Sequence, residues 1–238
     1  MLKDLQKTLK DKIQLRGVGL HSGQKVDLCL KPANVNTGIV FRRTDIESTK
    51  NTIKATYENV CSATLCTKIK NVYGVSVATI EHLMAAFYGE SIDNVLVEIN
   101  GPEVPIMDGS AIAFVDAIRS AGIAEQKDTK NFIKVLKKVE IKDGLKSISL
   151  EPLENDFKVN FTIIYKNKFI NTQTKEISLS RDNLSSIYDS RTFCLFDDIE
   201  KIKSQGLAQG GSLENAIVVK EDKILNEGGL RHKDEFVS

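Results

Sequence analysis

The chain contains no tryptophan, and aromatic residues make up only 6% of it. So few aromatic rings offer little surface on which nucleic-acid bases could stack. The formal net charge is +1 at pH 7, so no strong field draws the chain to nucleic acid or to an anionic membrane. Both deficits argue against a nucleic-acid-binding module, and we expect no nucleic-acid partner.

Long apolar runs are also missing. No stretch of eighteen or more apolar residues occurs, as a transmembrane helix requires, and the charged start shows no apolar core of a signal peptide. The four cysteines form no CxxC pair, which is typical of reduced thiols in a cytosolic protein: Cys29, Cys61, Cys66 and Cys194. We therefore expect a cytoplasmic monomer without stable membrane insertion.

Hydrophobic periodicity predicts strands followed by helices. Residues 26–30 alternate apolar and polar side chains, the period of a half-buried strand. Helices are predicted over 79–88, with Thr79 as the N-cap, and over 110–121, with Gly122 as the stop. Strand-like sequence then resumes in the second half of the chain. The order is not an alternating βαβ pattern, so the sequence predicts an α+β fold class.

The polar segment 125–130 reads as a linker between two domains. We expect an N-terminal α+β domain over 1–124 and a C-terminal α+β domain over 131–238. They are expected to be two similar sheet-plus-helix domains with helices packed between the sheets.

The residues that best indicate chemistry are Glu81 and His82. The chain has three histidines, His21, His82 and His232, so any zinc site must draw on very few imidazoles. A histidine can bind a metal while the neighbouring carboxylate takes a proton from the metal-bound water. Taken alone, the pair is more often an exposed glutamate beside a hydrogen-bonded histidine.

The surrounding motifs resemble those of the UDP-3-O-acyl-N-acetylglucosamine deacetylases of lipid A biosynthesis, the LpxC family. The resemblance extends over the whole chain and rests on long composite motifs. They are Gly19–Gly23, Gly38–Asp45, Thr79–Ala86, Ser91–Ala111, Arg191–Phe193, Gly206–Ala216, Leu225–Arg231 and Asp234–Val237.

The resemblance implies a Zn²⁺-dependent hydrolase that removes the N-acetyl group of UDP-3-O-acyl-N-acetylglucosamine, an early committed step of lipid A biosynthesis. It implies that His82 is a zinc ligand, Glu81 the general base and Thr192 a hydroxyl that stabilises the oxyanion. It further implies aromatic substrate contacts from Phe193 and Tyr165, acyl-chain contacts from Leu20 and Leu65, and an acyl-passage insert at about 194–225.

Structural alternatives stay open for these positions. Thr192 could end a helix, while Phe193, Tyr165, Leu20 and Leu65 could be core residues. For four further residues we favour a structural role. We expect His21 to stabilise its turn, Cys66 to be a buried thiol, and Asp108 and Ser110 to begin a helix.

The resemblance also implies zinc ligands after the Asp234–Val237 motif, where this sequence ends at Ser238. The chain thus resembles a C-terminally truncated member with an incomplete second domain, and we expect an exposed apolar surface there. A catalytic zinc site normally has three protein ligands, and His232 precedes the motif at a variable position. We expect the chain as given to be inactive, or to be a non-catalytic remnant that binds UDP-sugar or an acyl chain.

Overall fold

A five-stranded sheet supports the first half of the chain. In the computed structural model, which describes residues 4–47, 49–154, 156–180 and 182–238, the strand order is β2-β3-β9-β4-β5. The strands are β2 (Ile13–Val18), β3 (Lys25–Pro32), β4 (Ile39–Arg43), β5 (Thr52–Lys54) and β9 (Val95–Ile99). Neighbours pair antiparallel except β4 and β9, which are parallel. The apolar residues of β3 all point into the core, which confirms the predicted alternation.

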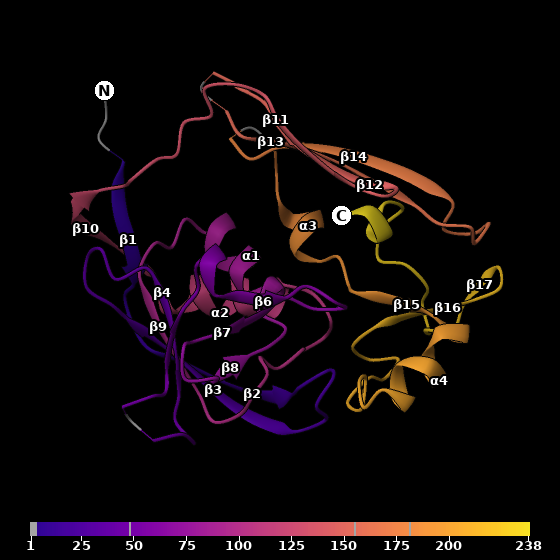
Figure 1. Cartoon of the computed structure of the whole chain (residues 1–238), viewed down its shortest axis with the longest axis horizontal. Helices are drawn as coiled ribbons and strands as arrows, with labels where there is room; N and C mark the ends of the chain where they lie inside the picture. The colour runs from indigo at the N-terminus through magenta and orange to yellow at the C-terminus, as the bar shows by residue number, and fades with distance from the viewer. Residues whose placement is uncertain (1–3, 48, 155, 181) are drawn as a thin grey trace.

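Two helices cover the inner face of this sheet. They are α1 (Glu81–Gly89) and α2 (Ile112–Ala121), and they lie between the sheet and the strands of the second half (Figure 1). Their buried residues recur at helical spacing: Leu83, Ala86 and Phe87 in α1, and Phe114, Val115 and Ile118 in α2. Gly122, at φ +78°, ends α2 as predicted. Within the described ranges, no helix is long and apolar enough to cross a membrane.

The predicted linker over 125–130 is wrong. Residues Ile123–Thr129 form strand β10, which pairs antiparallel with β1 (Leu5–Leu9). The pair is held by amide side chains more than by apolar burial: the Asn94 Nδ2 group donates to Gln6 Oε1 at 2.8 Å and to Gln126 Oε1 at 2.7 Å. Such a strand carries few apolar residues, so its sequence looks like a linker. The first half therefore extends to residue 129, beyond the predicted boundary at 124.

A small three-stranded sheet lies at the edge of the first half. It comprises β6 (Val60–Ser62), β7 (Lys68–Lys70) and β8 (Ser76–Val77), and follows the short 3-10 helix η1 (Tyr57–Asn59). The loop from β6 to β7 carries Leu65 and Cys66.

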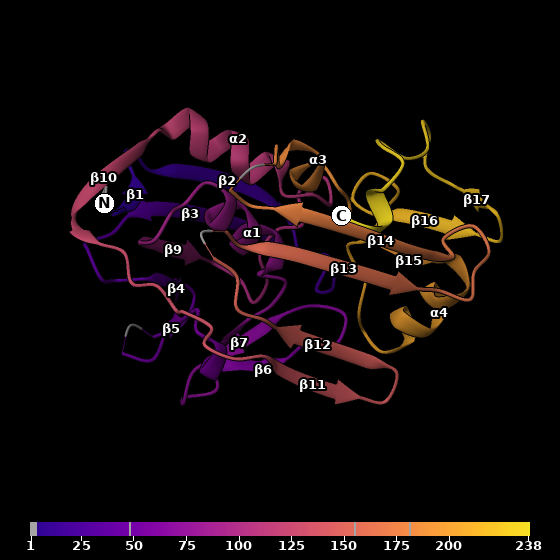
Figure 2. The same cartoon turned by 90° about the horizontal axis from the view of Figure 1, so that it is seen from above.

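The second half begins with two antiparallel hairpins, which Figure 2 shows from above. They pair β11 (Val139–Asp143) with β12 (Lys146–Leu150), and β13 (Lys158–Ile164) with β14 (Thr172–Ser178). After α3 (Ser185–Tyr188), the predicted insert folds as β15 (Phe193–Leu195), α4 (Phe196–Ser204), β16 (Ile217–Lys220) and β17 (Lys223–Ile224). The 3-10 helix η2 (Glu235–Val237) follows. Sheets and helices are thus combined in both halves, and the predicted α+β class is confirmed.

Apolar side chains of the hairpins stand in solvent. The exposed fractions are 64% for Ile141, 63% for Ile148 and 54% for Phe161. The hairpins contact the first half beside the start of β13, where the ring of Phe157 packs against that of Tyr88 of α1 with centroids 6.0 Å apart. The second half thus shows the exposed apolar surface that the sequence led us to expect.

A buried ion pair fixes η2 to the segment before β15. The Arg191 guanidinium donates from Nε to Glu235 Oε1 at 2.7 Å and from Nη2 to Oε2 at 3.1 Å. Glu235 is 1% exposed. Burial by itself raises the pKa of Glu235, but hydrogen bonds from the Arg191 side chain and from the backbone N–H groups of Arg231 and Arg191 outweigh it, so the pKa is lowered.

We predict that Glu235→Gln lowers the free energy of unfolding by about 3 kcal/mol at pH 7, because it leaves Arg191 buried without its charge partner. A carboxyl group whose pKa is lower in the folded than in the unfolded protein stabilises the fold above its unfolded-state pKa. This stabilisation is lost as pH falls through the folded-state pKa. Wild-type stability should therefore decline below the ordinary value of 4.5, and this decline should be weaker in the variant. Urea denaturation across pH 3–7 measures both effects, and equal pH dependence in the two proteins would contradict the prediction.

Candidate functional site

The start of helix α1 places Glu81 and His82 on its first turn. The predicted N-cap role of Thr79 is wrong, because the N-cap is Ile80, without a side-chain capping bond. Thr79 instead adopts φ +56°, and its hydroxyl donates to the Glu103 carboxylate at 2.7 Å. The Glu81 carboxylate accepts the backbone N–H of Thr67 at 3.0 Å. Glu81 is thereby tied to the loop that carries Leu65 and Cys66.

His82 lies in a partly buried, acidic setting. Burial lowers the pKa of its imidazole, and the nearby charges of Glu81 and Asp108 act in the opposite direction. The net direction is downward, which favours the neutral ring. Neutral imidazole is the form that binds a metal ion.

The turn Asp108–Ser110 joins the two halves beside His82. The Ser110 hydroxyl donates to Asp108 Oδ1 at 2.9 Å and accepts the N–H of Ile112 at 3.3 Å, at the start of α2. The N–H of Thr192 donates to the Gly109 carbonyl at 2.8 Å. This bond brings Thr192, from the second half, next to the turn whose Asp108 acts on the charge of His82.

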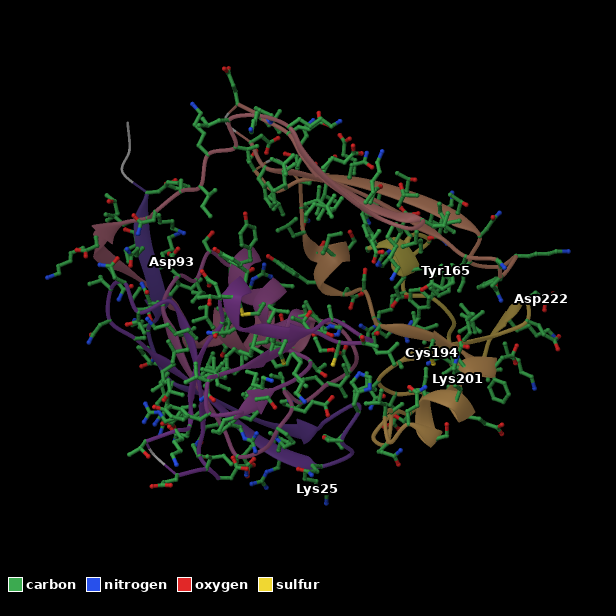
Figure 3. The ribbon with its side chains drawn as sticks, in the orientation of Figure 1. Lys25, Asp93, Tyr165, Cys194, Lys201 and Asp222 are labelled. Carbon is green, nitrogen blue, oxygen red and sulfur yellow. The ribbon has the colours of Figure 1, made fainter. Side chains whose placement is uncertain are left out.

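The two predicted aromatic residues meet each other. The rings of Tyr165 and Phe193 lie 5.4 Å apart, and Phe193 also packs edge-on against Phe236 at 5.0 Å. Figure 3 shows Tyr165 near the strand that carries Cys194, the residue after Phe193. Phe193 is partly buried and Tyr165 is 37% exposed. Their shared surface is therefore open to solvent on the Tyr165 side.

Leu20 and Leu65 lie on different loops. Leu65, at φ +61°, is 53% exposed and two residues from the N–H that binds Glu81. The Leu20 carbonyl accepts the N–H of Gly210 at 3.0 Å, within the predicted insert. Leu20 thus lies where the first half meets the insert, and Leu65 lies beside the Glu81 loop.

Two residues given structural roles from the sequence lie close to this region. His21 is buried, its Nδ1 accepts the N–H of Ala208 at 3.4 Å, and its Nε2 has no partner. Burial raises the pKa of the Cys66 thiol, Thr79 lowers it in part, and the charges of Glu81 and Glu103 raise it further. His21 therefore contacts the insert as well as its own turn.

Sequence reasoning missed Glu103. This carboxylate is 1% exposed and accepts three hydrogen bonds: from the N–H of His21 at 2.8 Å, the N–H of Ser22 at 2.7 Å and the Thr79 hydroxyl. A glutamate between Pro102 and Pro105 in an otherwise apolar segment is the signal that could have identified it.

A zinc site does not form from these residues alone. Among the described residues, no group of three or more His, Cys, Asp or Glu side chains is placed to hold a metal ion. His232 pairs with the Ser190 hydroxyl at 2.9 Å. A catalytic zinc ion normally has three protein ligands, so His82 by itself does not fit such a site.

These features define an α+β protein in which a helix of one half carries a Glu-His pair on its first turn, and a threonine from the other half is bonded to the turn Asp108–Ser110. The family model described as LpxC, UDP-3-O-acyl N-acetylglycosamine deacetylase, matches residues 6–238. The chain therefore belongs to this family.

Curated relatives agree with this assignment. The chain is 49% identical over 235 residues to the UDP-3-O-acyl-N-acetylglucosamine deacetylase of Chromohalobacter salexigens, covering 98% of this chain and 77% of that protein. It is 44% identical over 235 residues to the enzyme of that name from Haemophilus ducreyi, covering 98% of this chain and 76% of the relative. The enzyme of that name from Actinobacillus succinogenes is 47% identical over 236 residues, with the same two shares.

We predict that Gly109→Ala destabilises the contact between the halves. A Cβ at Gly109, where φ is +88°, would lie 2.2 Å from the Asn215 carbonyl oxygen. Gly144 is the matched control, because it has φ +57° and nothing within 4 Å of its Cβ position. Gly144→Ala should cost about 1 kcal/mol from backbone strain alone, and Gly109→Ala at least about 2 kcal/mol more. Equal losses in thermal and urea denaturation would show that the close approach contributes nothing.

Proposed function

We propose that this site hydrolyses the N-acetyl group of UDP-3-O-acyl-N-acetylglucosamine, the substrate named for its relatives, in the cytoplasm and in lipid A biosynthesis. The observation that carries the proposal is the hydrogen bond from the Thr192 N–H to the Gly109 carbonyl, beside Asp108, whose charge acts on His82. This arrangement supplies a carboxylate, an imidazole and a hydroxyl from two halves of the molecule.

The residues divide the work of amide hydrolysis. Glu81 accepts a proton from the attacking water, whose oxygen bonds to the acetyl carbon. The Thr192 hydroxyl donates to the oxyanion that forms on the carbonyl oxygen. The C–N bond then breaks, the amine nitrogen takes up the proton that Glu81 accepted from the water, and acetate is released.

Zinc dependence is part of the proposal, with His82 as one ligand. Among the described residues, no group of three or more His, Cys, Asp or Glu side chains is placed to hold a metal ion, and a zinc ion with fewer than three protein ligands would activate its water poorly. We therefore propose that the 238-residue chain, taken alone, binds zinc weakly and deacetylates its substrate slowly.

Acetate release from the substrate, measured in excess zinc, tests this proposal. We expect a rate at least about a hundredfold below that of the Chromohalobacter salexigens relative, since loss even of supporting residues around a metal typically costs 10–100-fold. Residual activity should fall at least about tenfold further in Glu81→Gln and stay unchanged in Glu98→Gln, whose carboxylate pairs with Lys31 at 2.6 Å. A rate equal to that of the relative would refute the proposed inactivity, and a rate insensitive to Glu81→Gln would refute the role of Glu81.

A second candidate function is binding of the UDP-sugar or acyl chain without catalysis. It is favoured by the aromatic cluster of Tyr165, Phe193 and Phe236, whose rings contact one another, whereas the described residues place no group of three or more metal-binding side chains together.

Calorimetric titration with the UDP-sugar substrate separates the two functions. Phe193→Ala should weaken binding about tenfold or more, because base–aromatic stacking contributes about 1–3 kcal/mol. Phe132→Ala is the control, since Phe132 is 73% exposed and lies before the hairpins. Binding without acetate release supports the non-catalytic function, whereas no binding at millimolar substrate excludes both.

A further inference from the structure

Glu103 occupies a buried position between the two loops that frame the site. Its segment pairs with the chain before α1, where the N–H of Ala78 donates to the Pro102 carbonyl at 2.9 Å and that of Val104 to the Ala78 carbonyl at 3.0 Å. On the other side, residues 19 and 105 form an isolated bridge. The carboxylate therefore lies between the start of α1 and the turn Gly19–Gly23.

Each carboxylate oxygen is used. Oε1 accepts both the His21 N–H and the Thr79 hydroxyl, and Oε2 accepts the Ser22 N–H. In the described part of the chain, Glu103 forms no ion pair with a lysine or arginine. A buried carboxylate without a cationic partner depends on such donors, so its position and those of the donors are fixed together.

One of these hydrogen bonds, from Thr79, connects Glu103 to the start of α1 and hence to Glu81. Thr79 is β-branched and holds φ +56°, a backbone conformation that persists only where the surroundings enforce it. The chain enters α1 two residues later, and the Glu81 carboxylate accepts the Thr67 N–H. The bond from Thr79 to Glu103 is a second side-chain contact that holds the start of α1.

The two other hydrogen bonds, from the N–H groups of His21 and Ser22, connect Glu103 to the turn on which the predicted insert lies. The turn Gly19–Gly23 presents the carbonyls of Leu20 and His21 to the N–H groups of Gly210 and Gln209, at 3.0 and 3.2 Å. Glu103 holds the same turn through the N–H groups of His21 and Ser22. The insert is thereby docked on a turn whose shape depends on this carboxylate.

We propose that Glu103 is a positioning residue that sets the start of α1 and the docking of the 206–211 segment with one carboxylate. It fixes the position of Glu81 relative to the insert and does not itself contact the substrate. The inference rests on the proposed function for the role of Glu81.

Residue-resolved amide hydrogen exchange of the 238-residue chain tests the proposal without zinc or substrate. The Thr67 N–H reports on the Glu81 carboxylate, and the N–H groups of Gln209 and Gly210 report on docking. Glu103→Gln has one acceptor oxygen in place of two, so either amide orientation leaves a turn N–H unpaired. We expect exchange at Gln209 and Gly210 to rise at least about tenfold in this variant, whereas Glu98→Gln should leave it unchanged.

Variants of Thr79 test the contact that leads to Glu81. Thr79→Val keeps the shape and removes the hydroxyl, so Thr67 exchange should rise at least about tenfold while Gln209 and Gly210 stay protected. Thr79→Ser keeps the hydroxyl and should restore wild-type exchange, which a residue that merely fills volume would not do.

Unchanged exchange at Gln209 and Gly210 in folded Glu103→Gln overturns the proposal, as does equal Thr67 exchange in the Val and Ser variants. If Glu103→Gln fails to fold, the Thr79 pair decides. Absence of acetate release would count against the proposed function alone, because none of these measurements depends on turnover.

Discussion

The arrangement of the molecule depends on close backbone contact between its two halves. At Gly109 a side chain would collide with the Asn215 carbonyl, and at Gly210 it would lie 2.3 Å from the Gly19 carbonyl oxygen. Backbone approach of this kind fixes distances more tightly than contacts between flexible side chains do. The Thr192 N–H bonds to the carbonyl of the same Gly109, so this close approach also fixes where Thr192 lies.

Regular elements could be predicted where burial imposes a period. Strand β3 and helix α2 bury one face each, so apolar residues recur at intervals of two in the strand and of three or four in the helix. Strand β10 could not be predicted in this way, because Asn94 and backbone pairing hold a segment that is mostly polar. The N-cap assigned to Thr79 failed because its hydroxyl is engaged by a residue 24 positions away.

The residues of the candidate site could be predicted from the sequence, but the residue that holds their loops in place could not. Glu81, His82 and Thr192 stand in motifs that a family resemblance identifies, and the family model matches the chain over residues 6–238. Glu103 belongs to the same motif region, yet its role depends on donors from His21, Ser22 and Thr79, which only the folded chain brings together. Bonds between distant segments leave no periodic trace in a sequence, so the sequence can mark Glu103 as unusual between Pro102 and Pro105, while its partners are recognised only in the folded structure.

The pairing of β1 with β10 bears on how the protein is made. Gln6 donates to the carbonyl of Thr129, across 123 positions of chain, so the first strand synthesised waits for one of the last strands of its own half. On the ribosome, β1 lacks its β10 partner until residue 129 has left the exit tunnel, although Lys7 can already bond to residues 93 and 94. Contacts this distant form slowly. Until its last strand arrives, the nascent first half therefore exposes one edge of β1, and exposed edges of this kind are prone to aggregation.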